Sequence, residues 1–243
     1  MDAKGDGVSD LAGNIGRVRE RVAEAAARSG RRPEAVTIVA VTKGVEPERI
    51  AEAVAAGISD LGENRVQEAA AKVAAVSGWN GLPAVRWHMV GHLQRNKVRQ
   101  AASLFSVIHS VDSEHLAADL SARTHSGPHP SIDILLQVNV AGEAHKFGVA
   151  PRQAASILRE IAGLSGLRVV GLMTIAPQTD DQETVRPIFR RLRELGDELR
   201  SSGIAGEEFT HLSMGMTDDF DVAVEEGATM VRIGRAIFGE RPA

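Results

Sequence analysis

A lysine at the end of an apolar, β-branched segment is the residue of this sequence with the plainest chemical potential. Residues 36–42 read Val-Thr-Ile-Val-Ala-Val-Thr, which favours a buried parallel strand, and Lys43 and Gly44 follow at once. An amine that loses hydration at the mouth of an apolar pocket becomes available for Schiff-base formation with an aldehyde. The alternative is that Lys43 caps the strand and extends its amine into water, which is the commoner arrangement.

Composition narrows the class of protein. The chain has 243 residues, 43% of them hydrophobic, so it is long enough for one α/β barrel or two small domains. A net charge of −4 without long runs of like charge gives no sign of a nucleic-acid binder. Cysteine is absent, which excludes disulfides, thiolate catalysis and cysteine-ligated metals. Residues 1–8 are polar and expected to be flexible, and no apolar stretch reaches membrane length, so we expect a cytoplasmic protein.

Eight segments have the composition of strands, and a helical pattern follows each of them except the last. An extra helix that Ser9 can cap precedes the first strand, with apolar residues in steps of three and four from Leu11 to Ala25. The predicted strands are residues 36–43, 58–64, 85–91, 104–111, 132–140, 167–175, 209–214 and 229–234. Helices are predicted over 47–57, 66–76, 96–102, from 112, and over 151–162, 184–200 and 217–226, with a loop over 124–130.

Eight strand-helix units without a linker predict a single-domain (β/α)8 barrel over residues 9–243. An open doubly wound sheet is the alternative if two strands are misassigned. No glycine-rich dinucleotide fingerprint follows the first strand, which argues against that alternative.

The carboxyl ends of barrel strands meet at one mouth, where barrels place their active sites. The residues expected there, most of them polar, are Lys43, Asn64, His88, Asp112, Asn139, Thr174, Ser213 and Gly234. Residues 211–217 and 231–236 supply small residues beside a helix expected to begin at Thr217, which predicts a cradle for a dianion.

A phosphate site opposite a strand-end lysine suggests an aldehyde-bearing phosphate ester, and pyridoxal 5′-phosphate (PLP) is the candidate. Arg232 could then hydrogen-bond the pyridine nitrogen and keep it unprotonated, which makes the ring a weaker electron sink. The alternative for Arg232 is a salt bridge at the barrel rim. The two interpretations stay open on these residues alone.

Several motifs together resemble the pyridoxal phosphate homeostasis proteins, which look like the barrel domain of bacterial alanine racemase standing alone. The matching stretches are residues 40–43, 62–64, 66–68, 87–94, 171–175, 213–220, 232–234 and 237–239. The resemblance implies a fold-type III PLP barrel in which Lys43 forms the aldimine and Arg232 faces the pyridine nitrogen. It also implies phosphate contacts from Ser213, Met214, Gly215 and Gly234, and ring contacts from Asn64, His88 and Met89.

Three places in the sequence bear on how closely its site matches that of the family. Members commonly have a second lysine and a proline soon after the aldimine lysine, whereas residues 43–47 read Lys-Gly-Val-Glu-Pro here. Arg235 stands where the family usually has a small hydroxyl residue, so a charged phosphate contact could replace a neutral one. Lys146 falls in the family's lysine-containing loop, either as a secondary cofactor contact or as a solvated loop residue.

The resemblance favours a non-catalytic carrier that takes part in vitamin B6 homeostasis and supplies PLP to apo-enzymes. The alternative is an amino-acid racemase of the alanine racemase type, whose second acid/base group is a tyrosine from another domain; this chain has no tyrosine. A third possibility is an aldolase that forms a Schiff base with its substrate at Lys43 and uses no cofactor. The histidine spacing favours no metal site. Without the second domain of the racemases, which supplies their dimer interface, we expect a monomer.

Overall fold

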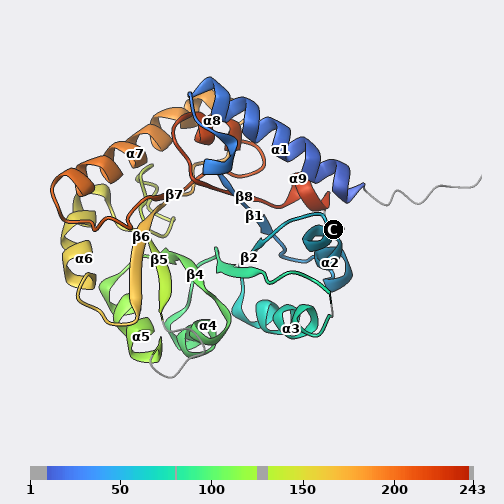
Figure 1. Cartoon of the computed structure of the whole chain (residues 1–243). Helices are drawn as coiled ribbons and strands as arrows, with labels where there is room; N and C mark the ends of the chain where they lie inside the picture. Colours follow the sequence, from blue (N-terminus) through green and yellow to red (C-terminus); the bar gives the residue numbers. More distant parts are fainter. Residues whose placement is uncertain (1–9, 80, 125–130, 241–243) are drawn as a thin grey trace, which may run out of the picture.

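The computed structural model describes residues 10–79, 81–124 and 131–240, and within them eight parallel strands close into a barrel in sequence order (Figure 1). The predicted flexible segment 1–8, Ser9 and most of the predicted loop 124–130 lie outside these residues. The strands are β1 (Thr37–Val41), β2 (Asp60–Glu63), β3 (Arg86–Met89), β4 (Val107–Val111), β5 (Ile132–Gln137), β6 (Leu167–Met173), β7 (His211–Ser213) and β8 (Met230–Ile233). The predicted (β/α)8 barrel is confirmed.

Helices surround the barrel; α2 to α8 connect successive strands, whereas α1 precedes the first strand and α9 follows the last (Figure 1). They are α1 (Leu11–Arg28), α2 (Pro47–Ala55), α3 (Val66–Ser77), α4 (Val98–Leu104), α5 (Glu114–Thr124), α6 (Ala154–Ile161), α7 (Arg186–Ser201), α8 (Phe220–Glu225) and α9 (Arg235–Phe238). Short 3₁₀ turns lie at Pro33–Ala35, Arg95–Lys97, Pro151–Gln153 and Gln182–Val185. None of the helices in the described ranges is long and apolar enough to cross a membrane.

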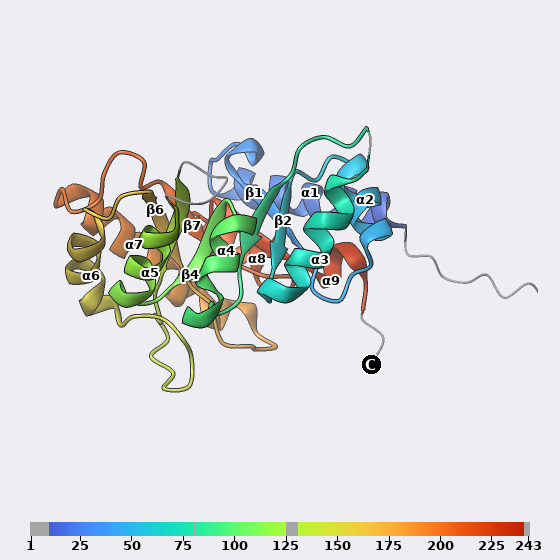
Figure 2. The ribbon, with the colours of Figure 1, turned by 90° about the horizontal axis from the view of Figure 1, so that it is seen from below.

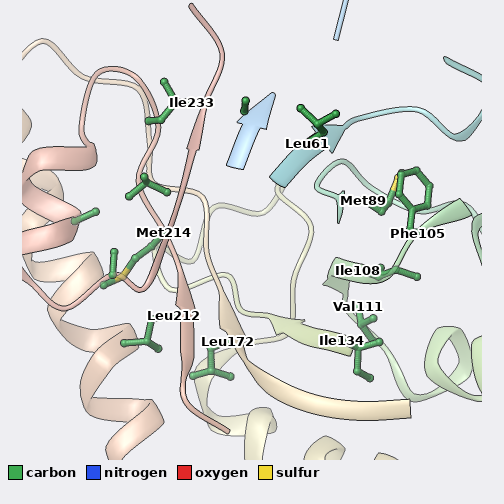
Figure 3. Packing of buried hydrophobic residues seen from close by; sticks show 14 of the residues in the cluster. Leu61, Met89, Phe105, Ile108, Val111, Ile134, Leu172, Leu212, Met214 and Ile233 are labelled. Atoms are coloured by element: carbon green, nitrogen blue, oxygen red, sulfur yellow. The ribbon is translucent and has the colours of Figure 1, made fainter. Parts of the chain in front are cut away.

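Alternation along each strand builds two separate layers of side chains. Successive residues of a strand point to opposite faces, so one set packs against the helices and the other fills the barrel. Ile108 and Ile134 belong to the large cluster between strands and helices shown in Figure 3, whereas their neighbours Val107 and Leu135 belong to a small separate cluster. The polar residues of the strands must therefore be placed by face before any role is assigned to them.

The extra N-terminal helix α1 packs against helices from the C-terminal part of the chain. Its buried face begins at Leu11 and Ile15 and packs against α8 and α9. Ion pairs from Arg28 to Glu225 and from Arg21 to Asp221 reinforce that contact. Asp10 caps this helix by accepting a hydrogen bond from the Gly13 N–H at 3.0 Å.

The elements differ from prediction mainly at their ends. The helix expected to begin at Thr217 begins at Phe220, after Asp219 has accepted a hydrogen bond from the Met216 N–H at 2.6 Å. A short helix, α9, follows the last strand, where none was expected. The loops after β5 (yellow-green) and β6 (orange) project from the same end of the barrel in Figure 2. This is the end where the carboxyl termini of the strands gather.

Candidate functional site

A pocket of about 420 Å³ lies at the carboxyl ends of the strands. Four of the predicted site residues line it together: Asn64, Arg232, Gly234 and Arg235. The remaining lining residues are Val41, Val90, Ile175, Gln178, Met216, Thr217, Asp218 and Glu240. We call this the mouth pocket; its walls come from the segments after β1, β2, β3, β6, β7 and β8.

A second pocket, of about 580 Å³, contains Lys43, Met89 and Asn64. We call it the lysine pocket. It is not the apolar surrounding expected for Lys43, because its other lining residues are mostly polar or basic: Arg65, Val66, Gln67, Gly91, His92, Gln94 and Lys97. Lys43 is half-buried, and its side chain has no hydrogen bond or ion pair within the described residues. No side chain among the described residues therefore competes for the Lys43 amine.

Asn64 belongs to both pockets and so marks the place where they meet. Its Oδ1 atom is buried and has no hydrogen-bond partner among the described residues. The backbone here is held by a close approach, since a Cβ atom on Gly91 would lie 2.4 Å from the Asn64 carbonyl oxygen. A buried oxygen without a partner is costly unless something else supplies a donor.

The main chain on either side of Lys43 is anchored to helix α3. Lys72 Nζ donates to the Thr42 carbonyl oxygen at 2.5 Å, and Glu68 Oε1 accepts from the Gly44 N–H at 2.5 Å. Lys72 and Glu68 also pair with each other at 2.7 Å, one helical turn apart. The peptide groups flanking Lys43 are thus fixed while its side chain is left free.

A buried carboxylate completes this anchor. The Glu63 side chain is 0% exposed, and its Oε1 accepts from Lys72 Nζ at 2.7 Å and from the Thr42 hydroxyl at 2.5 Å. Burial raises the pKa of Glu63 above its usual value, although the bonds from Lys72 and Thr42 oppose that shift. Lys72 was not predicted as part of the site; its signal in the sequence is a lysine on the same helix face as the buried Val66 and Ala69.

Arg232 lies at the floor of the mouth pocket and not in a rim salt bridge. Its Nη1 donates to the Ser213 hydroxyl at 2.6 Å and its Nη2 to the Thr174 carbonyl oxygen at 2.8 Å. Burial lowers its pKa to about 10, against an opposing attraction from Asp219. The guanidinium remains charged at neutral pH and is held by two acceptors.

The predicted phosphate cradle is only partly present. Met214 is fully buried, and its N–H donates to the Met230 carbonyl oxygen at 3.1 Å, so it offers nothing to the pocket. Gly215, also buried, has a φ of +92°, and a Cβ there would lie 2.6 Å from the Ala223 Cβ. That glycine therefore lets the loop after β7 pack closely on α8.

Arg235 lines the mouth pocket but its charge is already balanced. Its guanidinium pairs with Asp218 and, at 3.4 Å, with Glu240. Lys146, the predicted secondary contact, pairs with Glu143 and lies outside the lining of both pockets. Neither cation is free in the way that Lys43 is.

His88 and Ser213 do not line either pocket, because their side chains point into the barrel. His88 Nε2 lies 2.9 Å from Asp60 Oδ1, and His88 Nδ1 lies 2.8 Å from His109 Nε2. His109 Nδ1 lies 2.8 Å from the Ser213 hydroxyl. Since β4 and β7 are not neighbours in the barrel, this last bond crosses its interior. His109 was not predicted as part of the site; its signal in the sequence is a histidine in the middle of a buried strand.

Around the mouth, the described side chains contain no group of three or more histidine, aspartate or glutamate residues that could hold a metal ion. His92 stacks on Phe147, with ring centroids 3.7 Å apart and planes 8° from parallel. Its Nδ1 also lies 3.6 Å from Asp112 Oδ2. The loops after β3 and β5 therefore touch each other beside the lysine pocket.

The chain is similar to known proteins over nearly its whole length. The model of the family "Alanine racemase, N-terminal domain" matches residues 14–242. The "Pyridoxal phosphate homeostasis protein" of Aquifex aeolicus (strain VF5) is 42% identical over 228 residues, which cover 93% of this chain and 96% of the relative. The structure of PipY from Synechococcus elongatus PCC7942 with PLP bound superposes with a TM-score of 0.81 at 34% identity, covering 95% of this chain and 100% of PipY. An alanine racemase of Clostridium difficile 630 shares the fold at 14% identity with a TM-score of 0.68, covering 97% of this chain and 58% of that one.

Proposed function

Since the chain belongs to the alanine racemase N-terminal domain family, we propose that it binds PLP through Lys43 and acts in the cytoplasm as a carrier of the cofactor. The observation that carries the proposal is the pair of adjoining pockets, one holding a lysine with no partner among the described residues and the other a buried arginine. PipY, 34% identical, is described with PLP bound. The relative from Aquifex aeolicus is named for PLP homeostasis.

The residues present fit the cofactor. When bound, PLP supplies an aldehyde for an amine, a ring nitrogen and a phosphate dianion. The free amine of Lys43 would hold the aldehyde end, and the guanidinium of Arg232 would face the ring nitrogen. The unpartnered Oδ1 of Asn64 lies between the two pockets and suits a ring substituent that donates a hydrogen bond.

For the phosphate we propose Gly234 and the backbone of the loop after β7, including Gly215. We omit the Met214 N–H, which is already bonded, and the Ser213 hydroxyl, which bonds to Arg232 and His109. Met89 contributes to the wall around Lys43. His88 acts behind the pocket through its neighbours, and Arg235 is a peripheral contact because two carboxylates balance its charge.

We favour the carrier role over catalysis because racemisation requires a second acid/base group beside Lys43. Proton exchange at both faces of a substrate carbon takes two acid/base groups, and Lys43 can serve as only one of them. The sequence has no tyrosine. Burial lowers the pKa of His88 and holds that of His109 well below its usual value, and neither of these two histidines lines a pocket. His92 does line the lysine pocket, but its ring is stacked on Phe147 and its Nδ1 faces Asp112. We propose that the chain works as a monomer and that apo-enzymes are the recipients.

Borohydride trapping tests the proposal. PLP added to the protein should give a visible absorbance band that borohydride removes, and peptide mapping should locate the reduced label on Lys43. Lys43→Ala should lose the label, whereas Lys146→Ala, which removes an ion-paired loop lysine, should keep it. A label on another lysine would refute the assignment.

A second assay separates a carrier from an enzyme. The PLP-loaded protein, incubated with single L-amino acids, should give neither racemisation nor transamination above background. Multiple turnovers of either reaction would overturn the carrier role.

A further inference from the structure

A continuous line of buried polar side chains crosses the inside of the barrel. It runs from Arg232 through Ser213, His109 and His88 to Asp60, with every link between 2.6 and 2.9 Å. All five residues are at most 4% exposed. Burying five polar side chains among apolar strands is costly unless each donor meets an acceptor.

The acceptor end of this line fixes the positions of its protons. Asp60 receives hydrogen bonds from the Arg86 Nε at 2.8 Å and the Ser59 hydroxyl at 2.6 Å. Burial raises the pKa of Asp60, but the bonds from His88 and Ser59 outweigh that effect and leave it below its usual value. An ionised carboxylate can only accept, so His88 must donate to it from Nε2.

Each following link is then determined. Burial lowers the pKa of His88 and that of His109, so both rings are neutral at pH 7 and carry one proton each. Because His88 has its proton on Nε2, its Nδ1 accepts from the Nε2–H of His109. The Nδ1 of His109 then accepts from the Ser213 hydroxyl, whose oxygen accepts from Arg232. Arginine can only donate, so both ends of the line agree and no donor meets a donor.

From this agreement we infer that Asp60, His88, His109 and Ser213 form a one-directional hydrogen-bond relay that positions the Arg232 guanidinium in the mouth pocket. The four are positioning residues for the contact between Arg232 and the ring nitrogen of PLP, and this part of the inference rests on the proposed function. The relay keeps a lone pair of Ser213 aimed at Arg232, and the Thr174 carbonyl oxygen fixes the other terminal nitrogen.

The direction of the relay is testable without any cofactor. In protein labelled with ¹⁵N at histidine, long-range ¹⁵N–¹H spectra at pH 7 should show His88 and His109 neutral and protonated on Nε2. Their Nε2 protons should exchange slowly with solvent because they are buried and bonded. A charged ring, or an Nδ1-protonated ring, at either position would overturn the relay, whatever the outcome for PLP binding.

The positioning role is tested with PLP and three variants at the far end of the relay. Asp60→Ala removes the terminal acceptor and should weaken PLP binding about tenfold and shift the ¹⁵N signal of the ring nitrogen in labelled cofactor. Asp60→Asn keeps an acceptor oxygen and should restore both readouts to within about twofold of wild type. Arg86→Met, which removes only the partly exposed donor to Asp60, should leave both unchanged.

The outcomes are distinguishable. An Asp60→Ala protein whose ring-nitrogen signal and PLP affinity match those of wild type would overturn the positioning role. If Asp60→Ala does not fold, His109→Gln interrupts the relay at its centre and is judged by the same two readouts. If wild-type protein takes up no PLP, the proposed function fails, while the tautomer measurement still decides the relay.

Discussion

Replacing Lys72 by methionine should destabilise the protein strongly, because it leaves the buried Glu63 carboxylate without its cation. The Glu63 side chain is 0% and that of Lys72 8% exposed, and their charged atoms are 2.7 Å apart. Removing one partner of a buried pair costs about 3–5 kcal/mol, since the other charge stays buried and uncompensated. For a domain of this length that corresponds to a fall in Tm of roughly 6–20 °C.

The loss should also depend on pH. Burial already raises the pKa of Glu63, and removing Lys72, which opposes that shift, raises it further. A carboxyl whose pKa is higher in the folded state takes up its proton on folding, so the folded state is favoured at low pH. The deficit of Lys72→Met should therefore be largest above the folded-state pKa of Glu63 and shrink as pH falls toward 4.5.

Urea denaturation at pH 8 and at pH 5, followed by circular dichroism, measures both effects. Lys146→Met is the matched control, because it removes an ion pair in a loop at the edge of the barrel and should cost at most about 1 kcal/mol. The double variant Glu63→Gln with Lys72→Met removes both charges and should recover much of the loss. A Lys72→Met protein as stable as wild type at pH 8 would refute the reasoning.

Two further predictions concern Asn64 and its neighbour. Asn64→Leu should weaken PLP binding about tenfold, or ~1.4 kcal/mol. Because the substitution removes a buried oxygen without a partner among the described residues, the urea midpoint should be equal to or above that of wild type. A PLP titration and a urea titration measure the two effects, and an unchanged PLP affinity would contradict the prediction. Gly91→Ala should cost about 1–3 kcal/mol, because its Cβ would lie 2.4 Å from the Asn64 carbonyl oxygen. Gly163→Ala is the control, because no atom lies within 4 Å of the carbon that it adds. Equal urea midpoints for the two alanine variants would contradict the prediction and show that the backbone around Gly91 moves to accommodate the added carbon.

The barrel could be predicted from sequence because alternating strand and helix patterns are local. Helix ends were predicted less well, because they depend on single hydrogen bonds. Thr217 was expected to begin a helix, but Asp219 accepts a hydrogen bond from the Met216 N–H and the helix begins at Phe220. The helix α9 was missed because four residues carry too little periodicity to be recognised.

The residue types at the strand ends predicted much of the site, but the sequence did not predict as well the direction in which each side chain points. Lys43, two residues after β1, and Arg232, on β8, line pockets at the mouth as expected, although the surroundings of Lys43 are mostly polar and not apolar. Met214 and His88 were predicted to touch the cofactor, but neither side chain lines a pocket. His88 is bonded to Asp60 and His109 inside the barrel, and Met214, which follows β7, is buried in the large hydrophobic cluster. Lys72 was missed because its role comes from contacts with Glu63, on another element.

Helix α1 has a consequence for the order in which the protein can be completed during synthesis. It is synthesised before every strand of the barrel, whereas the helices that bury its apolar face, α8 and α9, come after β7 and β8 respectively. The partner of β1 on its second edge is β8, which is likewise separated from it by six other strands. The apolar face of Leu11, Ile15 and Val18 therefore stays without its partner helices while those strands are made, and until then it is a surface that a chaperone could bind.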